Sequence, residues 1–338
     1  MIPGYTTSDG IDWNDIWYGP GGIANAIDLY RSVDMPLIRS LAMPWGETQI
    51  KYAVGIKNGF QVLGPGQQPD RKAVQMAAFY PDVTKYGYAV GTDADTLARS
   101  TGREIALALN RPMKEDPENV LTRFLERLMV DPGTSNANYG LYNGQFSPEE
   151  KISAPPQYQQ QVFTADHTHY LASAAAGSLQ NVDITEMKAT IRHHGNGGAI
   201  AGFINSTTVQ ALENAASWQG NQIIRSPISD QVAIAGFGET FQLLGVNWYV
   251  SEMIPDNYVL MIVASPMQDE QKCLVMFEPP NLRGLMLWPG NNANYPLIGS
   301  EFSRWFGLKV MNRGAAAVLY FGEQQDEENP VWVDPVFV

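Results

Sequence analysis

The sequence predicts an α+β protein, because helical and strand patterns occupy different parts of the chain. Helical patterns are concentrated between residues 92 and 130 and again between 183 and 195. From Val232 onward, apolar and polar residues alternate as they do in half-buried strands. Helices and strands that are segregated along the chain in this way are typical of the α+β class.

The composition is that of a globular protein with a sizeable core. The chain has 338 residues, of which 44% are hydrophobic, enough for one large domain or two smaller ones. No apolar run approaches the ~18 residues that a membrane span needs, and the N-terminus lacks the pattern of a secretory signal. Cys273 is the single cysteine, which excludes an internal disulfide, and we expect its side chain to be buried.

The charge argues against direct nucleic-acid binding as the main activity. The net charge is −13, and the 22 Lys and Arg residues form no run. Proteins that bind phosphates present basic side chains, because their affinity comes from counterion release. An acidic shell around DNA is physically reasonable, since weak repulsion would keep the nucleic acid from adhering to it.

Residues 1–45 are predicted to form an irregular arm. Large apolar side chains such as Trp17 and Tyr18 stand among Gly, Pro and Asp, and a short helix is expected from Ile23 to Tyr30. This apolar surface must pack on the same subunit or on a neighbour, and the sequence leaves both alternatives open.

Residues 46–91 are predicted to form an extended loop with two strand-like segments, Glu47–Val54 and Lys72–Tyr80. A two-stranded ribbon of this polar composition is not stable alone. We therefore expect another chain to order it.

The main helices are expected between residues 92 and 130. Thr101 and Glu104 form a capping box, and Pro117 marks a second helix start after an interruption near Pro112. One apolar stripe then follows, formed by Val120, Leu121, Phe124, Leu125 and Leu128.

A further helix is expected from Asp183, which can cap it with the help of Glu186, to a left-handed turn at Gly195. Ile184, Met187 and Ile191 occupy one face of it.

All four histidines, His167, His169, His193 and His194, lie in or beside this segment. A His-x-His pair with a second pair of histidines could bind a metal ion. Against this, adjacent residues at a helix end point about 100° apart, so we expect His193 and His194 not to converge on one ion. Histidines in hydrogen bonds, one of them near a helix C-terminus, need no ligand role. The sequence therefore predicts no metal site.

No catalytic or cofactor-binding residues are predicted either. The glycine-rich stretches at residues 194–198 and 236–238 lack the Lys-Ser/Thr pair of a phosphate loop and the spacing of a dinucleotide loop. No Ser-His-Asp set can be identified. The sequence accordingly favours a structural protein over an enzyme.

Several passages, in order, resemble the major capsid proteins of tailed bacteriophages, in particular those that infect actinobacteria. These passages are HTHY at residues 167–170 leading into the helix that ends in HHG, IPDNYVL at 254–260, LRGL at 282–285, and GLKV and RGAAAVLY between 307 and 320. The resemblance extends from about residue 15 to the C-terminus.

The resemblance implies the Hong Kong 97-type fold. Its expected parts are an N-terminal arm (1–45), an extended β-hairpin loop (46–91), a peripheral domain with a long spine helix (92–182), an axial domain (183–306), and a return to the peripheral domain with a C-terminal tail (307–338). In this family the extended loop overlaps an adjacent subunit.

The implied function is that of a major capsid subunit in the virion. Copies of the chain would assemble in the bacterial cytoplasm through hexamers and pentamers into an icosahedral shell around double-stranded DNA, without sequence-specific DNA binding or a membrane. Portal, scaffold and decoration proteins are expected partners. Because only about 45 residues precede the extended loop, we expect a separate scaffold protein or none. Lys51, Lys57 and Lys72 are available for the cross-link that some members form, but no feature marks one of them.

Two alternatives remain. An encapsulin-type nanocompartment uses the same fold around enzyme cargo, and its contents would distinguish it from a phage capsid. A histidine-metal hydrolase belongs to a different class, and bound zinc lost on His167→Ala or His169→Ala would favour it.

Overall fold

A computed structural model gives the structure of the chain. It describes residues 6–20, 22–33, 41–45, 50–54, 75–79, 83–130, 140–141, 167–173, 177–214, 224–226, 239–264, 272–289, 297–323 and 331–337.

Among the described residues, most of the helical ones lie in the first half of the chain. Its elements are α1 (Trp13–Tyr18), α2 (Ile23–Val33), β1 (Ala42–Trp45), β2 (Ile50–Val54), β3 (Gln75–Phe79), β4 (Thr84–Asp93), α4 (Ala94–Arg99) and α5 (Gly102–Met129). The second half is mainly strands: β5 (Tyr170–Ala172), α6 (Asn181–Arg192), β6 (Ala199–Ile204), α7 (Ser206–Asn214), β7 (Ile224–Ser226), β8 (Glu239–Leu243), β9 (Val246–Val250), β10 (Tyr258–Ala264), β11 (Leu274–Phe277), a 3₁₀ turn (Pro280–Leu282), β12 (Met286–Pro289), β13 (Leu297–Val310) and β14 (Ala316–Tyr320).

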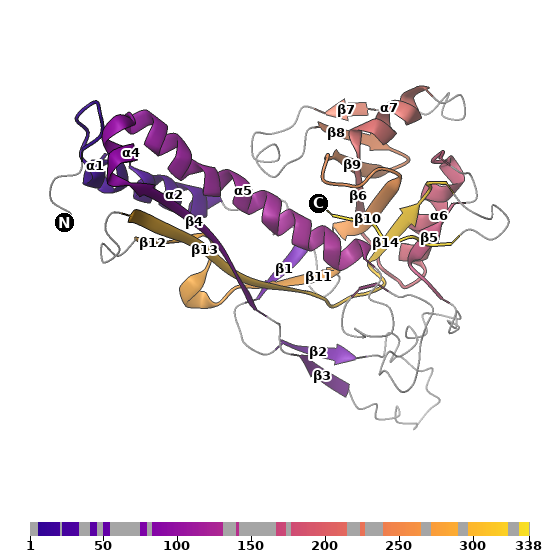
Figure 1. The fold of residues 1–338 in the computed structure, drawn as a ribbon. Coiled ribbons are helices and arrows are strands. Elements are labelled where there is room, and N and C mark those ends of the chain that lie inside the picture. The colour runs from indigo at the N-terminus through magenta and orange to yellow at the C-terminus, as the bar shows by residue number, and fades with distance from the viewer. Residues whose placement is uncertain are drawn as a thin grey trace, which may run out of the picture.

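In Figure 1 the seven-stranded sheet lies near the C-terminal end of the long helix α5, and the five-stranded sheet runs along the helix. The seven-stranded sheet has the order β5-β14-β10-β6-β9-β8-β7 and carries α6 and α7. The five-stranded sheet has the order β1-β11-β13-β12, and β4 pairs with the long strand β13 on its other side. The paired strands β4 and β13 run alongside α5 (Figure 1), so the helix and these two strands form one elongated part of the molecule.

Each of the two larger sheets contains strands from more than one of the predicted segments. Strand β14, within residues 307–338, belongs to the seven-stranded sheet together with β6 and β10. Strands β11 and β12, within residues 183–306, belong to the sheet of β4 instead. The chain therefore crosses between the two sheets several times, and the division into domains remains a prediction.

Helix α5 is one continuous helix, which corrects the predicted interruption near Pro112 and second start at Pro117. Its N-terminus has the predicted capping box: Glu104 N donates to Thr101 Oγ1 at 3.3 Å, and Thr101 N donates to the Glu104 carboxylate at 2.8 Å. A proline inside a helix removes one backbone hydrogen bond and costs about 3 kcal/mol. Tertiary packing of the helix offsets this cost.

That packing comes first from the predicted apolar stripe, which is fully buried. Val120, Leu121, Phe124, Leu125 and Leu128 are each at most 1% exposed. They belong to the main core, which continues into α6 and the seven-stranded sheet. At about 1.5–3 kcal/mol for each fully buried large side chain, the stripe outweighs two internal prolines.

The second anchor of α5 is a buried ionic junction. Arg304 of β13, 1% exposed, donates from Nη1 to Asp116 Oδ2 at 2.6 Å and from Nη2 to Glu278 Oε1 at 2.8 Å. Tyr30 of α2 donates its hydroxyl to the same Asp116 oxygen at 2.9 Å, and the Gly284 N–H donates to Glu278 Oε1 at 3.2 Å. The junction therefore joins α2, α5, β13 and the loop after β11.

The N-terminal arm packs on its own subunit through one face. Ile16, Trp17, Ile23 and Ile27 form a second core with residues of α5, β13 and the loop before β12. The other face carries Leu29, which is 69% exposed. Of the two predicted alternatives, packing on the same subunit is therefore the one observed for the buried face.

The apolar C-terminal tail, residues 331–337, docks on the body. Trp332 and Phe337 pack against the main core, and Tyr258 donates its hydroxyl to the Val333 carbonyl at 2.9 Å. Residues 142–166 and 324–330 lie outside the described residues.

Candidate functional site

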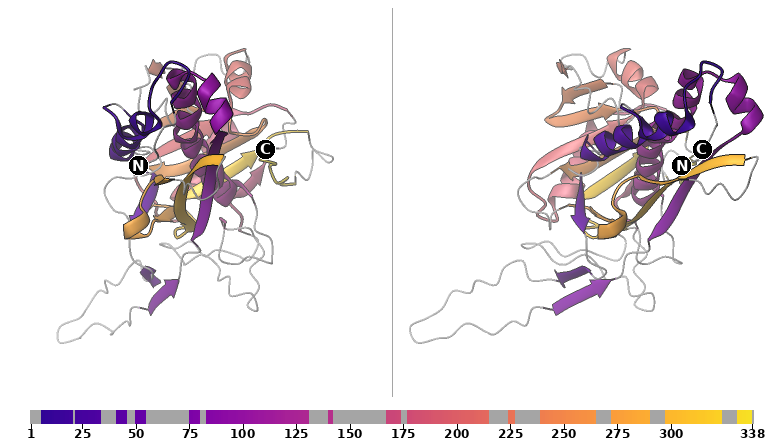
Figure 2. Two further views of the ribbon diagram at one scale, coloured as in Figure 1. Left: turned by 60° about the vertical axis from the view of Figure 1, so that its left-hand side comes forward. Right: turned by 90° about the vertical axis from the view of Figure 1, so that its left-hand side faces the viewer.

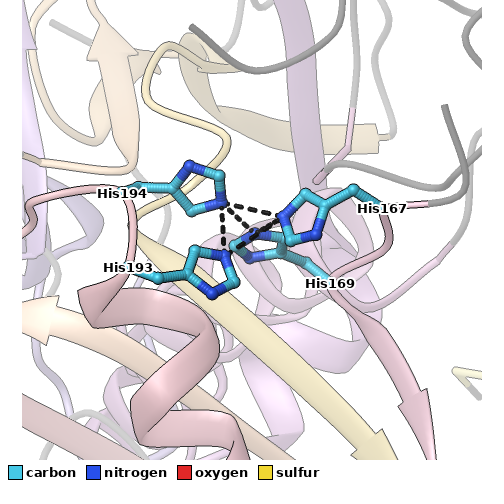
Figure 3. A group of neighbouring side chains, drawn as sticks. All are labelled: His167, His169, His193 and His194. Carbon is cyan, nitrogen blue, oxygen red and sulfur yellow. Dashed lines mark hydrogen bonds between the residues drawn. The ribbon is translucent and has the colours of Figure 1, made fainter. Parts of the chain in front are cut away.

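The four histidines converge at one point between α6 and the seven-stranded sheet (Figure 3). His167 and His169 lie just before β5, and His193 and His194 follow the last turn of α6. Gly195 has φ +75°, so it ends the helix in the predicted left-handed conformation. This turn reverses the chain directly after the two histidines.

The Nε2 atoms of the four rings are the atoms that meet. The His194 Nε2 atom lies 2.8 Å from that of His169, 2.9 Å from that of His167 and 3.0 Å from that of His193. The His167 Nε2 atom lies 3.1 Å from that of His169 and 3.3 Å from that of His193. All four ligand nitrogens lie within 4.8 Å of one another.

This arrangement corrects the expectation that His193 and His194 diverge. The 100° separation of neighbours on a helix holds for their Cβ directions, but the helix ends at Arg192 and these two residues form its C-terminal turn. Their side chains can therefore bend toward one point. The one available signal in the sequence was the gathering of every histidine of the chain into residues 167–194.

The start of α6 also differs from the prediction, and this difference supports the site. The helix begins at Asn181 rather than after Asp183. The buried Asp183 carboxylate instead accepts from the Gln180 N–H at 2.8 Å and from the Ser173 hydroxyl at 3.1 Å. Because Ser173 follows β5, Asp183 ties α6 to the strand that His167 and His169 precede.

Hydrogen bonds to groups outside the cluster orient the His169 ring and the turn that carries His194. His169 is fully buried, and its Nδ1 lies 2.6 Å from the Ala316 carbonyl oxygen of β14. Since a carbonyl only accepts, this contact places the proton of His169 on Nδ1 and leaves Nε2 with a lone pair. Asn196 donates to the Gly314 carbonyl at 2.6 Å and thereby fixes the turn that carries His194.

Burial favours the neutral form of three of the rings. Desolvation lowers the pKa of His167 to about 4 and that of His169 to about 3, and it lowers the pKa of His193 as well. A neutral imidazole is the form that can bind a metal ion. Among the residues that the structure describes, this is the one group of His, Cys, Asp or Glu side chains close enough together to bind an ion.

The remaining candidate residues take no part in this cluster. Cys273 is fully buried as expected, and burial raises the pKa of its thiol. Residues 194–198 form the turn after α6 and then an exposed loop rather than a phosphate loop. Lys57, Lys72 and residues 236–238 lie outside the described residues, as does the side chain of Lys51.

Strands β2 and β3 form a second feature of functional interest. They pair with each other, Ile50 opposite Phe79 and Val54 opposite Gln75, and form a two-stranded sheet of their own. Figure 2 shows this ribbon set apart from both larger sheets. The predicted two-stranded ribbon is therefore confirmed. Within the described residues, no helix is long and apolar enough to cross a membrane.

Comparison with solved structures establishes the class of fold. The chain is similar to a protein of Mycobacterium phage Patience, with a TM-score of 0.59 and 22% identity over 94% of this chain and 90% of that one. It is also similar to the capsid of an empty GTA particle (TM-score 0.53, 14% identity, 86% and 91% covered) and to the SrpI encapsulin of Synechococcus elongatus (TM-score 0.52, 15% identity, 88% and 90% covered). The predicted Hong Kong 97-type capsid fold is thereby confirmed.

No protein-family model matches the sequence, and no curated protein matches it. The similarity to the solved structures is therefore a similarity of fold.

Proposed function

We propose that this chain is the major capsid subunit of a tailed bacteriophage. Copies of it would assemble through hexamers and pentamers into an icosahedral shell that encloses double-stranded DNA. The observation that carries the proposal is a capsid-type fold extending over nearly the whole chain. The role is structural, and the energy of assembly is the sum of many modest interfaces repeated around a closed symmetric object.

The β2–β3 ribbon supports this proposal. An isolated two-stranded hairpin is at best marginally stable in water, so it needs a surface to lie on. Here the ribbon forms no sheet with the rest of the described chain. We propose that the predicted segment 46–91 contains the extended loop, that the β2–β3 ribbon is its ordered part, and that the surface is an adjacent subunit. The last residues of the segment, from Thr84 onward, belong to β4 and pair with β13 of the same chain. Residues 1–45 would form the arm beside it, with exposed groups such as Leu29 available for contacts between subunits.

The charge is consistent with a container for nucleic acid. With a net charge of −13, the chain offers little attraction for phosphate, so enclosed DNA would not adhere to the wall. The shell would be built in the cytoplasm of the host bacterium, with portal, scaffold and decoration proteins as separate partners.

An encapsulin-type compartment is the second candidate, because the SrpI encapsulin shares the fold at a similar TM-score. The two candidates differ in contents: nuclease-protected DNA in one and a cargo protein in the other. A histidine-metal hydrolase is disfavoured by the geometry. Four protein nitrogens fill a tetrahedral coordination sphere, whereas a catalytic zinc site keeps one position open.

Electron microscopy and sedimentation of the purified recombinant chain test the proposal. We expect closed shells, rings or tubes that sediment far faster than a 37.3 kDa monomer. A chain that stays monomeric under crowding and with added scaffold protein would overturn the assembly function. Shells isolated from infected cells that hold a co-purified enzyme instead of DNA would favour the encapsulin alternative.

A further inference from the structure

We propose that His167, His169, His193 and His194 together bind one Zn²⁺ ion in a closed, structural site. This inference does not depend on the assembly function, because it rests on the geometry of four side chains within one subunit.

Hydrogen bonding among the rings does not account for their arrangement. Each Nε2 atom has one in-plane position, which holds either a proton to donate or a lone pair to accept. Four such atoms can therefore make at most two well-directed hydrogen bonds with one another. Five Nε2–Nε2 distances are nevertheless 3.3 Å or shorter. A cation at the centre would use all four lone pairs at once.

The distances match tetrahedral coordination. Zinc–nitrogen bonds of 2.0–2.1 Å in a tetrahedron separate the ligand atoms by about 3.3 Å. The five distances of 2.8–3.3 Å approach this value. A square-planar site would have two long diagonals among its six nitrogen pairs, whereas here at most one pair is long.

The donor set selects the class of metal. Four imidazole nitrogens without a carboxylate are poor ligands for Mg²⁺ and Ca²⁺, which prefer oxygen. Cu²⁺ and Ni²⁺ favour square-planar or tetragonal sites. Zn²⁺ has no electronic preference and accepts the tetrahedron that the fold provides.

The cluster has the kind of outer hydrogen bond that orients ligands in protein metal sites. A ligating histidine commonly donates its other ring N–H to a carbonyl or carboxylate, which fixes the tautomer. His169 makes this contact with Ala316 of β14 at 2.6 Å. The ion would thus join three segments: the residues before β5, the end of α6 and, through His169, strand β14. With four protein ligands, it would stabilise the fold rather than catalyse a reaction.

The first test uses the unmodified full-length chain. The protein is dialysed against a chelator, and Zn²⁺ is then titrated in competition with a chromophoric chelator. We expect one tight site per chain, and Co²⁺ in place of Zn²⁺ should show the intense visible absorption of a four-coordinate cobalt ion. Absence of a stoichiometric site, or the weak spectrum of octahedral cobalt, would overturn the proposal.

The second test removes a ligand at a half-buried position, where the fold tolerates substitution better. His193→Asn should weaken Zn²⁺ binding by at least ~100-fold, the upper end of what second-shell changes cause. If this variant does not fold, the cobalt spectrum of the unmodified chain decides alone. Unchanged affinity in a folded variant would contradict the site.

A matched pair of alanine variants tests the position of one ring without removing a ligand. A Cβ atom at Gly314 would lie 2.8 Å from Cγ of His194, whereas a Cβ atom at Gly197 would meet nothing within 4 Å. Gly314→Ala should therefore weaken Zn²⁺ binding ~10-fold or more, and Gly197→Ala should leave it unchanged. Equal affinities in the two variants would show that the His194 ring is not a ligand.

Discussion

The molecule contains two buried polar clusters that are satisfied in opposite ways. At the ionic junction, one guanidinium meets two carboxylates, and every short contact joins a donor to an acceptor. At the histidine cluster, nitrogen atoms of one kind face each other at 2.8–3.3 Å. In the first cluster, charges of the protein itself compensate one another. In the second, the compensation that we propose is a bound cation, so the two clusters would offset the cost of buried polarity in different ways.

Both clusters connect segments that are distant in sequence. Asp116 and Arg304 are 188 residues apart, and His169 and Ala316 are 147 residues apart. At each cluster a helix meets a strand that is distant from it in sequence: α5 meets β13 at the junction, and α6 meets β14 at the histidines. The contrast between them can therefore be tested by removing the Arg304 guanidinium from the junction and the proposed Zn²⁺ ion from the histidine cluster.

The largest effect is expected at the ionic junction. Arg304→Met removes the cation that lies between the buried Asp116 and Glu278 carboxylates, while Glu278 keeps a longer contact of 3.8 Å with the exposed Arg283. Breaking a buried ion pair costs about 3–5 kcal/mol. The loss would be measured as the free energy of unfolding of the unassembled chain in urea. Metal has no role at this junction, so added Zn²⁺ should leave the loss unchanged.

A triple variant provides the control. Replacing Arg304, Asp116 and Glu278 together by Met, Leu and Leu removes the charges along with their need for partners. Such replacements are often neutral or stabilising, so the triple variant should recover most of the stability. A triple variant less stable than Arg304→Met would show that packing, not charge, dominates the junction.

Removal of metal should have the next largest effect, at the histidine cluster. A ligand that binds the folded state alone stabilises it by about 2.7 kcal/mol when its free concentration is 100 times Kd. Chelation of the Zn²⁺-loaded chain should lower the free energy of unfolding by about that amount, and His193→Asn should abolish the difference. An equal chelator effect in the variant would place the metal elsewhere.

Tyr30→Phe should have a smaller effect on the junction. It removes one hydrogen bond to the charged Asp116 oxygen, while Arg304 keeps its own contact with the same atom. A hydrogen bond to a charged group contributes about 1.5 kcal/mol at the lower end of its range. The melting temperature should fall modestly, and a loss as large as that of Arg304→Met would mean that α2 rather than the ion pair holds the junction.

The smallest effect is expected at the start of α5, away from both clusters. Thr101→Ala removes the side-chain half of the capping box and should cost about 1 kcal/mol. Thr101→Ser keeps the hydroxyl and should be nearly neutral. Zn²⁺ affinity should be identical in both variants, which makes them a baseline for the histidine substitutions.

Local patterns were sufficient for much of the fold. The capping box of Thr101 and Glu104, the buried stripe of α5 and the buried face of α6 follow from residues three or four positions apart. The pairing of β2 with β3 was predicted from two strand-like segments that follow one another in the chain. The capping box and the two buried helix faces depend on contacts between near neighbours in the chain, so their physics is contained in short windows of sequence.

Long-range contacts settled the rest. Pro112 and Pro117 locally oppose a continuous helix, and α5 forms because its stripe is buried in the core and Asp116 binds Arg304 of β13. Strand β14 joins the seven-stranded sheet because it pairs with β10 and β5, which no local pattern indicates. Similarly, adjacency in sequence predicted diverging rings for His193 and His194. Their convergence with His167 and His169 required the end of α6 to lie against the start of β5, an arrangement created by burial of the core that surrounds them.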